Sequence, residues 1–320
     1  MRRIQVTVAL TLVVAVCAVG TSQGTFPGPD GPILFRADNF ETGLPGPLMR
    51  AEPDGSDVTK INRRHAFFSD FRADGRRIAI DIVQRDFDSQ IATLRPNGDG
   101  FRVITSGPGI HDSPTWSPNG RRIAFNFSRL TPDDPDFETR LWTIRANGTH
   151  ARRLPMSDRG FDVEPKFSPN GRWIAFNRLR FPDGGFTQAT FIVSMKGKHH
   201  VRRLTPWHLD AEHPTWSPDS KWILFNTSPN GTIQAVRPNG EDRHTIRAAG
   251  VGFGGHKPWF SPEGDRIVFM CENQGTLQQP PEDYNQDICV MDADGENINN
   301  ITETEGIYEN YPAWGRAPGG

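Results

Sequence analysis

The sequence has little of several things that would point to a function directly. Charge of one sign is not in excess, because 36 Lys and Arg face 38 Asp and Glu, giving a net charge of −2 over 320 residues. This balance is typical neither of a nucleic-acid coat nor of an acidic disordered tail, and we expect no nucleic-acid partner. Hydrophobic residues make up 35% of the chain and 32 of the 320 residues are glycine, a composition ordinary for a globular protein.

Long apolar runs are also scarce. The only one, Ile4 to Val19, follows Arg2 and Arg3 and ends beside Gly20. A positive start, an apolar stretch and small residues are typical of a secretory signal, predicted here as residues 1–20. The alternative is an uncleaved anchor, because 16 residues nearly reach the ~17–25 that span a bilayer. We expect an exported protein, periplasmic or extracellular, with no transmembrane segment once the signal is removed.

Cysteine is rare, and only Cys271 and Cys289 lie beyond the predicted signal. No Cys-x-x-Cys pair is present, which argues against a thiolate zinc site. In an exported chain the two cysteines meet an oxidising compartment, so we predict a disulfide between neighbouring antiparallel strands. The alternative is a pair of buried free thiols.

Familiar catalytic motifs are missing in the context that they need. Neither a P-loop nor His-Glu-x-x-His occurs, and the glycine-rich string Gly250 to Gly255 leads into Pro258 rather than a helix. We therefore expect no cofactor.

What the chain does have is an internal repeat. Four copies of a Pro-x-aromatic-Ser-Pro motif occur, with a degenerate copy before them and a truncated copy after them. Their anchor aromatics are Phe71, Trp116, Phe167, Trp216, Phe260 and Trp314. The first five lead into alternating apolar segments such as Arg122-Ile-Ala-Phe125, which we read as strands. The Ser-Pro-Asn-Gly between them suits a tight hairpin turn.

A second turn signal marks each unit further along. It is an Asx-Gly or Lys-Gly pair between apolar runs, and it occurs at Asp54, Asn97, Asn147, Lys196, Asn239 and Asp294. Each unit therefore has four strands. Four-stranded units that repeat every ~40–50 residues are typical of propeller blades. The sequence predicts an all-β, six-bladed propeller of four-stranded antiparallel blades, forming a single domain over residues 21–320.

The two ends of the chain complement each other. The last unit stops after its anchor strand at Trp314, and the first begins at Ile33 without an anchor before it. We expect the N- and C-terminal strands to share one blade and to close the ring, which would remove two exposed sheet edges.

The repeat Pro-x-[Trp/Phe]-Ser-Pro-[Asn/Asp]-Gly-x-x-Ile-Ala-Phe, with Val290 to Gly295 and the Leu204-Thr205 ending, resembles the TolB-type (PD40) β-propeller repeat over residues 27–318. The resemblance implies the propeller part only. Residues 21–32 alone separate the predicted signal from the first strand, so the additional N-terminal α/β domain of TolB, a periplasmic protein, is not expected.

Polar residues gather just before the anchor strands, where the blades of a propeller converge at one mouth of the channel. Such loops can pool imidazoles and carboxylates around a polar ligand or a divalent cation. The alternative is that these side chains simply cap turns. The candidate binding residues are His65, His111, Asp112, Asp162, Glu164, Glu212, His213, His256 and Glu309.

The leading hypothesis is a monomeric, non-catalytic scaffold that binds a protein or cell-envelope partner. The second is a metal-dependent polysaccharide lyase or hydrolase that holds its metal through His111, His213 and His256. The repeat is similar to that of oligogalacturonate lyases, seven-bladed propellers with a channel-mouth metal held by histidines. The third hypothesis is a small-ligand or glycan-binding module.

Overall fold

A computed structural model describes the residues 25–39, 46–61, 66–84, 88–129, 138–156, 160–182, 185–228, 231–248, 253–273, 286–304 and 307–319. The predicted signal, residues 1–20, lies outside them. Strands dominate the described residues, with a single 3-10 turn at Trp207–Leu209. No helix in this part of the chain is long and apolar enough to cross a membrane.

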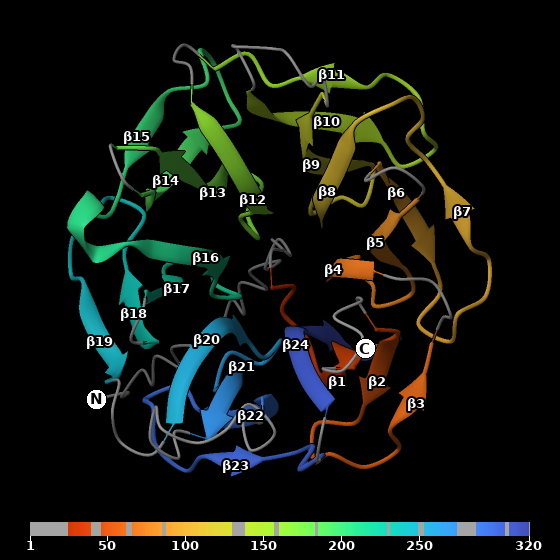
Figure 1. The fold of residues 1–320 in the computed structure, drawn as a ribbon, viewed down its shortest axis with the longest axis vertical. Coiled ribbons are helices and arrows are strands. Elements are labelled where there is room, and N and C mark those ends of the chain that lie inside the picture. The colour runs from red at the N-terminus through yellow and green to blue at the C-terminus, as the bar shows by residue number, and fades with distance from the viewer. Residues whose placement is uncertain are drawn as a thin grey trace, which may run out of the picture.

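Antiparallel pairing divides the strands into groups of four, arranged around a common centre (Figure 1). Four consecutive groups run from β4 to β19. Their strands are β4 (Ala66–Phe71), β5 (Ile78–Val83), β6 (Ser89–Leu94) and β7 (Arg102–Val103); β8 (Ile110–Trp116), β9 (Arg122–Ser128), β10 (Thr139–Arg145) and β11 (Arg152–Arg153); β12 (Phe161–Phe167), β13 (Trp173–Arg180), β14 (Thr187–Ser194) and β15 (Val201–Arg203); and β16 (Ala211–Trp216), β17 (Ile223–Thr227), β18 (Thr232–Val236) and β19 (His244–Arg247).

Strands from the two ends of the chain form the remaining groups. One contains β20 (Phe253–Phe260), β21 (Arg266–Asn273), β22 (Gln286–Asp292) and β23 (Asn299–Asn300); the other contains β24 (Ile307–Arg316), β1 (Asp30–Asn39), β2 (Leu48–Ala51) and β3 (Thr59–Lys60). β24 pairs antiparallel with β1, with Trp314 opposite Ile33. The expected sharing of one group by both ends is thus present in the strand pairing.

The first strand of each group lies nearest the centre and contacts the first strand of the next: β4, β8, β12, β16, β20 and β24 in turn, with β24 also against β4 (Figure 1). We call these the inner strands. The hydrophobic core lies between neighbouring groups, where Trp116, Trp216 and Trp314 are each at most 2% exposed. The anchor aromatics of the repeat therefore belong to the core.

The repeated Ser-Pro-Asn-Gly sequence forms the turn between the first two strands of a group. Between β8 and β9, Gly120 donates its N–H to the Ser117 carbonyl at 2.8 Å, and Ser117 donates to the Arg122 carbonyl at 2.9 Å. Gly120 has a φ of +62°, which a residue without a Cβ adopts at little cost. The Asn119 side chain accepts the Arg121 N–H at 3.0 Å and completes the turn.

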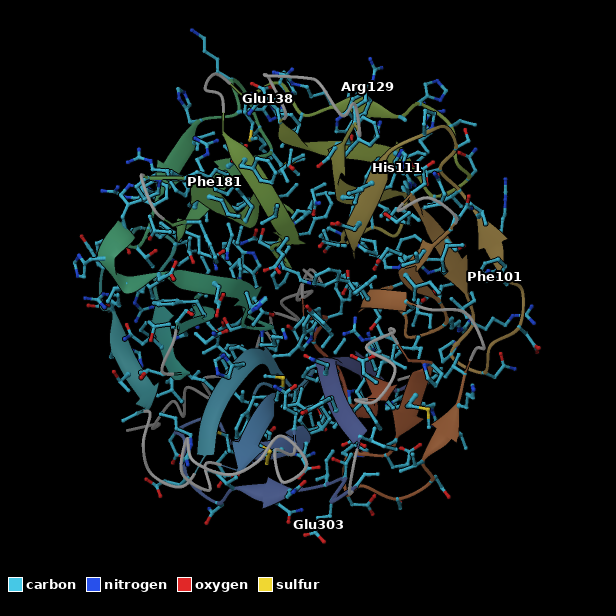
Figure 2. The ribbon with its side chains drawn as sticks, viewed as in Figure 1. Phe101, His111, Arg129, Glu138, Phe181 and Glu303 are labelled. Atoms are coloured by element: carbon cyan, nitrogen blue, oxygen red, sulfur yellow. A yellow bond between two sulfur atoms is a disulfide. The ribbon has the colours of Figure 1, made fainter. Side chains whose placement is uncertain are left out.

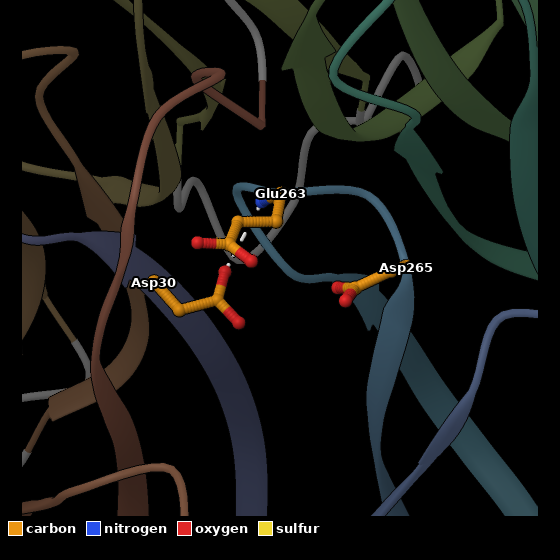
Figure 3. Close-up of side chains that lie close together, drawn as sticks. All are labelled: Asp30, Glu263 and Asp265. Atoms are coloured by element: carbon orange, nitrogen blue, oxygen red, sulfur yellow. Dashed lines mark hydrogen bonds between the residues drawn. The ribbon is translucent and has the colours of Figure 1, made fainter.

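Acidic residues fasten β1 to the turn between β20 and β21 (Figure 3). Asp30 accepts the backbone N–H of Glu263 at 3.1 Å and the guanidinium of Arg266 at 2.5 Å. Glu263 and Asp265 complete an acidic group whose oxygens lie within 4.8 Å of one another. Because Arg266 neutralises Asp30, we interpret this acidic group as a structural connection between β1 and the turn that joins β20 to β21.

The disulfide prediction is confirmed. Cys271 on β21 and Cys289 on β22 are bonded, with Cα atoms 5.7 Å apart. In the strand register Cys271 faces Asp287 and Cys289 faces Phe269, so the bridge joins diagonal rather than directly opposite positions.

Candidate functional site

The inner strands together line a cavity of about 40 Å³ at the centre of the molecule. Each contributes the residue three positions before its anchor aromatic. These residues, which we call the channel layer, are Phe68, Ser113, Glu164, His213, Lys257 and Tyr311. The cavity therefore gathers side chains that are roughly fifty residues apart in sequence, as blades of this repeat length require.

The backbone of the channel layer is unusual in a repeated way. Five of its residues immediately precede a proline and have a φ of +53° or +54°; they are Ser113, Glu164, His213, Lys257 and Tyr311. The strand register is interrupted at each of these positions. A residue before proline normally avoids helical conformations, and a non-glycine residue at positive φ costs on the order of 1–3 kcal/mol. Such bulges redirect side chains, here into the channel.

Side chains on the second strands hold these bulges. The Asn126 carbonyl oxygen accepts the Glu164 N–H at 3.2 Å, and that of Asn226 accepts the Lys257 N–H at 3.1 Å. Asn126 and Asn226 lie at equivalent positions of their groups, one residue after the Ile-Ala-Phe type segment. The repeat thus supplies both the bulge and an amide that satisfies its exposed N–H.

The charged members of the channel layer are satisfied by their neighbours. His213 Nδ1 lies 2.8 Å from Glu164 Oε2. Although burial alone would raise it, the pKa of Glu164 is held below its usual value by His213 and the nearby lysines. Lys257 Nζ donates to Asn310 Oδ1 at 2.6 Å and lies 3.9 Å from the centre of the Tyr311 ring.

A second set of residues lies one position before the anchor aromatics, two positions after the channel layer in sequence. Lys166 Nζ stacks 4.3 Å from the centre of the Trp259 ring, a cation–π contact. Burial lowers the pKa of Lys166, while the carboxylates of Asp70 and Glu164 oppose that shift. Burial likewise raises the pKa of Asp70 to about 6. The cavity wall thus combines aromatic faces with ammonium and carboxyl groups.

The structure brings some of the predicted site residues together. Glu164 and His213 line the cavity, and Glu212 Oε2 lies 4.0 Å from His213 Nε2. Glu212 is held by Asn226 at 2.9 Å, and Asn226 also lies 3.3 Å from His256 Nδ1. Glu164, Glu212, His213 and His256 therefore form one connected polar group.

Other predicted residues serve the blades instead. Asp162 is fully buried, and its oxygens accept Arg178 Nε at 2.6 Å and Nη2 at 3.0 Å. Asp112 accepts the Ser113 hydroxyl at 3.1 Å, and burial raises its pKa to about 6. Burial raises the pKa of Glu309 to about 7, and its Oε1 accepts the Thr304 hydroxyl at 3.1 Å.

The histidines expected to share a metal are not brought together. His111 lies on β8, outward from the centre of the ring (Figure 2). Its Nδ1 is 3.0 Å from the Ser89 carbonyl, and its ring packs 4.6 Å from the Phe127 ring. Among the described residues, the group of acidic, histidine or cysteine side chains close enough to hold an ion is Asp30, Glu263 and Asp265. His111, His213 and His256 do not belong to that group, and their role as metal ligands stays a prediction. His65 lies outside the described residues.

Sequence reasoning missed four members of the channel layer: Phe68, Ser113, Lys257 and Tyr311. A signal for three of them was present, because the residue directly before the first proline of each repeat copy faces the channel. A proline-induced bulge displaces the alternation of the strand by one, so counting by twos from the anchor aromatic misplaces these side chains.

The one hydroxyl of the channel layer that belongs to a serine is engaged by its neighbour in the chain. The Ser113 hydroxyl donates to Asp112 rather than to His213, so no nucleophile and base are paired in the channel layer. The cavity lining offers aromatic faces, two ammonium groups and a paired carboxylate for contacts with a group of mixed apolar and polar character.

The chain matches the TolB β-propeller domain over residues 48–318 and belongs to that family. An uncharacterised protein of Agrobacterium fabrum is 26% identical over 248 residues, which is 67% of this chain and 84% of that protein. A tricorn protease homolog of Saccharolobus solfataricus is 28% identical over 145 residues, 45% of this chain but only 12% of that protein.

Solved structures agree on the fold. TolB of Acinetobacter baumannii superposes with a TM-score of 0.70 at 20% identity, covering 90% of this chain and 67% of that one. A TolB-type protein of Agrobacterium tumefaciens superposes with a TM-score of 0.60 at 18% identity, covering 88% of this chain and 98% of that one. At these identities the likeness establishes the fold alone.

Proposed function

We propose that this protein is an exported, non-catalytic scaffold that binds a protein or cell-envelope partner at its central cavity. Residues 21–320 form a single six-bladed propeller whose ring is closed by the pairing of β24 with β1. The protein acts as a monomer and needs no cofactor.

The channel layer is the observation that carries this proposal. Each inner strand contributes one channel-layer residue to the cavity lining, and five of these six residues have a strained backbone. Strain of this kind persists where surrounding structure enforces it, and it is concentrated at functional positions. Glu164 pairs with His213 and Lys257 donates to Asn310, so these side chains are held by their neighbours and give the cavity a preformed surface.

Two further observations support export. The Cys271–Cys289 disulfide is of a kind that forms and persists in oxidising compartments. Residues 1–20 have the composition of a secretory signal. Membership in the TolB propeller family fits a role in the cell envelope.

Site-specific photo-crosslinking tests the proposal. A benzophenone amino acid at Tyr311, in the cavity, should give one defined crosslinked species with an envelope fraction of the source cells. The same amino acid at Val58, 49% exposed and outside the cavity, serves as the matched control. Equal labelling at both positions, or none at Tyr311, would contradict a partner site in the channel. Turnover of an acidic polysaccharide by the purified protein would instead favour the enzyme hypothesis.

A further inference from the structure

A second depression lies apart from the central cavity, at the hairpin turns of the β8–β11 group. It has a volume of about 710 Å³ and is lined by the two turns that follow β8 and β10. Three of its lining residues are arginines, Arg121, Arg122 and Arg145, and none is acidic. A concave surface with three guanidinium groups and no lining carboxylate is a site of concentrated positive charge.

Two of these arginines stand directly opposite each other. Arg122 on β9 and Arg145 on β10 are partners in the antiparallel register. Like charges at directly opposite positions destabilise a sheet, so this pair opposes folding when nothing lies between the guanidinium groups. Places where a sequence breaks a local rule in this way are commonly functional.

In two other groups the corresponding arginine has a compensating partner, whereas the β4–β7 group has arginines, Arg77 and Arg95, at both positions. Arg266 on β21 faces Asp292 on β22. In the β16–β19 group, Arg237 stacks 4.2 Å from the centre of the Trp222 ring and bonds Asp242 at 2.8 Å. The β8–β11 group thus shares its arginine pair with the β4–β7 group, but the turns of the β4–β7 group carry Asp74 and Asp99.

The turns of the β8–β11 group lack the acidic residues that several of their counterparts have. Asn119 stands where three equivalent turns have an acidic residue, Asp74, Asp219 or Glu263, and where the β12–β13 turn also has an asparagine, Asn170. Asp74 pairs with Arg72, and Asp219 pairs with Lys221. At the second turn, Thr149 stands where three other groups have an acidic residue, Asp99, Glu241 and Glu296. The turn geometry survives these changes, because the Asn119 side chain still accepts the Arg121 N–H. Only the negative charge is gone.

A buried donor points to what is missing. Arg122 Nη1 is buried and makes no hydrogen bond with any described residue. Arg102 adds a fourth guanidinium at the rim, because its Nη2 donates to the Asn147 carbonyl at 3.0 Å. A buried guanidinium nitrogen without an acceptor is costly, and an oxyanion between the arginines would remove both this cost and the repulsion.

We infer that this depression binds a ligand with closely spaced oxyanions, phosphate or carboxylate groups, held by Arg121, Arg122 and Arg145. Arginine forks match the geometry of both oxyanions, and several guanidinium groups together favour a multiply charged ligand over a single one. The site is independent of the central cavity, so its failure would leave the proposed function standing.

Isothermal titration calorimetry at low ionic strength tests the inference, with tripolyphosphate and citrate as the two probes. The unmodified protein should bind at least one probe, with an affinity that falls as salt is added. Arg145→Gln should weaken that binding at least about tenfold, the effect of losing one charge-assisted contact. Arg237→Gln, the equivalent change in the β16–β19 group, should leave the affinity unchanged. The better-bound probe identifies the oxyanion.

A melting experiment separates binding from folding. Without a probe, Arg145→Gln should unfold at the same temperature as the unmodified protein or higher, because one member of the repelling pair is gone. The probe should then raise the melting temperature of the unmodified protein and of Arg237→Gln, but not of Arg145→Gln. Absence of binding to both probes, or an equal loss of affinity in the two variants, would overturn the inference.

Discussion

Replacing Asp162 with Asn should destabilise the protein severely, although this residue lies beside the candidate site rather than in it. The carboxylate is fully buried, and both its oxygens bond Arg178, whose side chain is only 7% exposed. The substitution leaves the guanidinium buried opposite a neutral amide. Removing one partner of a buried ion pair costs about 3–5 kcal/mol, which is a large share of the ~5–15 kcal/mol that stabilises a domain.

Urea unfolding at pH 7, followed by tryptophan fluorescence, measures the free energy of unfolding. It is applied to the unmodified protein, to Asp162→Asn and Arg178→Met, and to the double variant. The double variant Asp162→Asn/Arg178→Met should regain much of the loss, because no unpaired charge then remains. Lys221→Met breaks the exposed pair with Asp219 and should cost only about 0–1 kcal/mol. A loss below about 1 kcal/mol for Asp162→Asn, or full additivity in the double variant, would refute the assignment of Asp162 to the fold.

Three further predictions follow from the fold. Replacing both Cys271 and Cys289 with Ala should lower the free energy of unfolding by about 3 kcal/mol, since the bridge closes an 18-residue loop; an unchanged urea midpoint would contradict this. Burial raises the pKa of Asp81 to about 8, so the folded state retains a proton that the unfolded state loses near pH 4, and stability should fall between pH 4 and 8. Asp81→Asn should flatten that decline, and an identical pH profile of urea midpoints would refute the shift. Gly315→Ala should cost about 1–3 kcal/mol because its Cβ would lie 2.5 Å from a buried phenylalanine ring, whereas Gly185→Ala, with nothing within 4 Å, should be near neutral; equal thermal shifts would contradict this account.

Much of the fold could be predicted because the same strand and turn signals recur in each unit of the repeat. The anchor aromatics predicted the inner strands, and the Ser-Pro-Asn-Gly and Asx-Gly pairs predicted the hairpins that the structure contains. The incomplete units at the two ends predicted the pairing of β24 with β1. Each of these features is local in sequence or follows from repetition, so no single weak signal had to carry the prediction.

The site was harder because its side chains depend on the bulges. Selecting polar residues before the anchors found Glu164 and His213, which line the cavity, but also Asp162 and His111, which do not. Polarity alone cannot separate a channel residue from a buried partner of an arginine. The aromatic members, such as Tyr311, were missed because aromatic side chains before a strand suggest core rather than site.

The arginine-lined depression depended on knowing the strand register. The sequence shows Arg122 and Arg145 as ordinary basic residues near turns, and the repeat alone does not say that they face each other. Only the pairing of β9 with β10 makes them opposite, and only then does the loss of acidic residues at Asn119 and Thr149 become significant.

The most direct test of the central claim, that the channel is a binding surface rather than a metal centre, is elemental mass spectrometry of residues 21–320 purified without chelator. The account predicts no stoichiometric divalent metal and no difference between the unmodified protein and a variant with His111, His213 and His256 replaced by Ala. About one equivalent of metal that disappears in the triple variant would contradict the account and favour an enzyme.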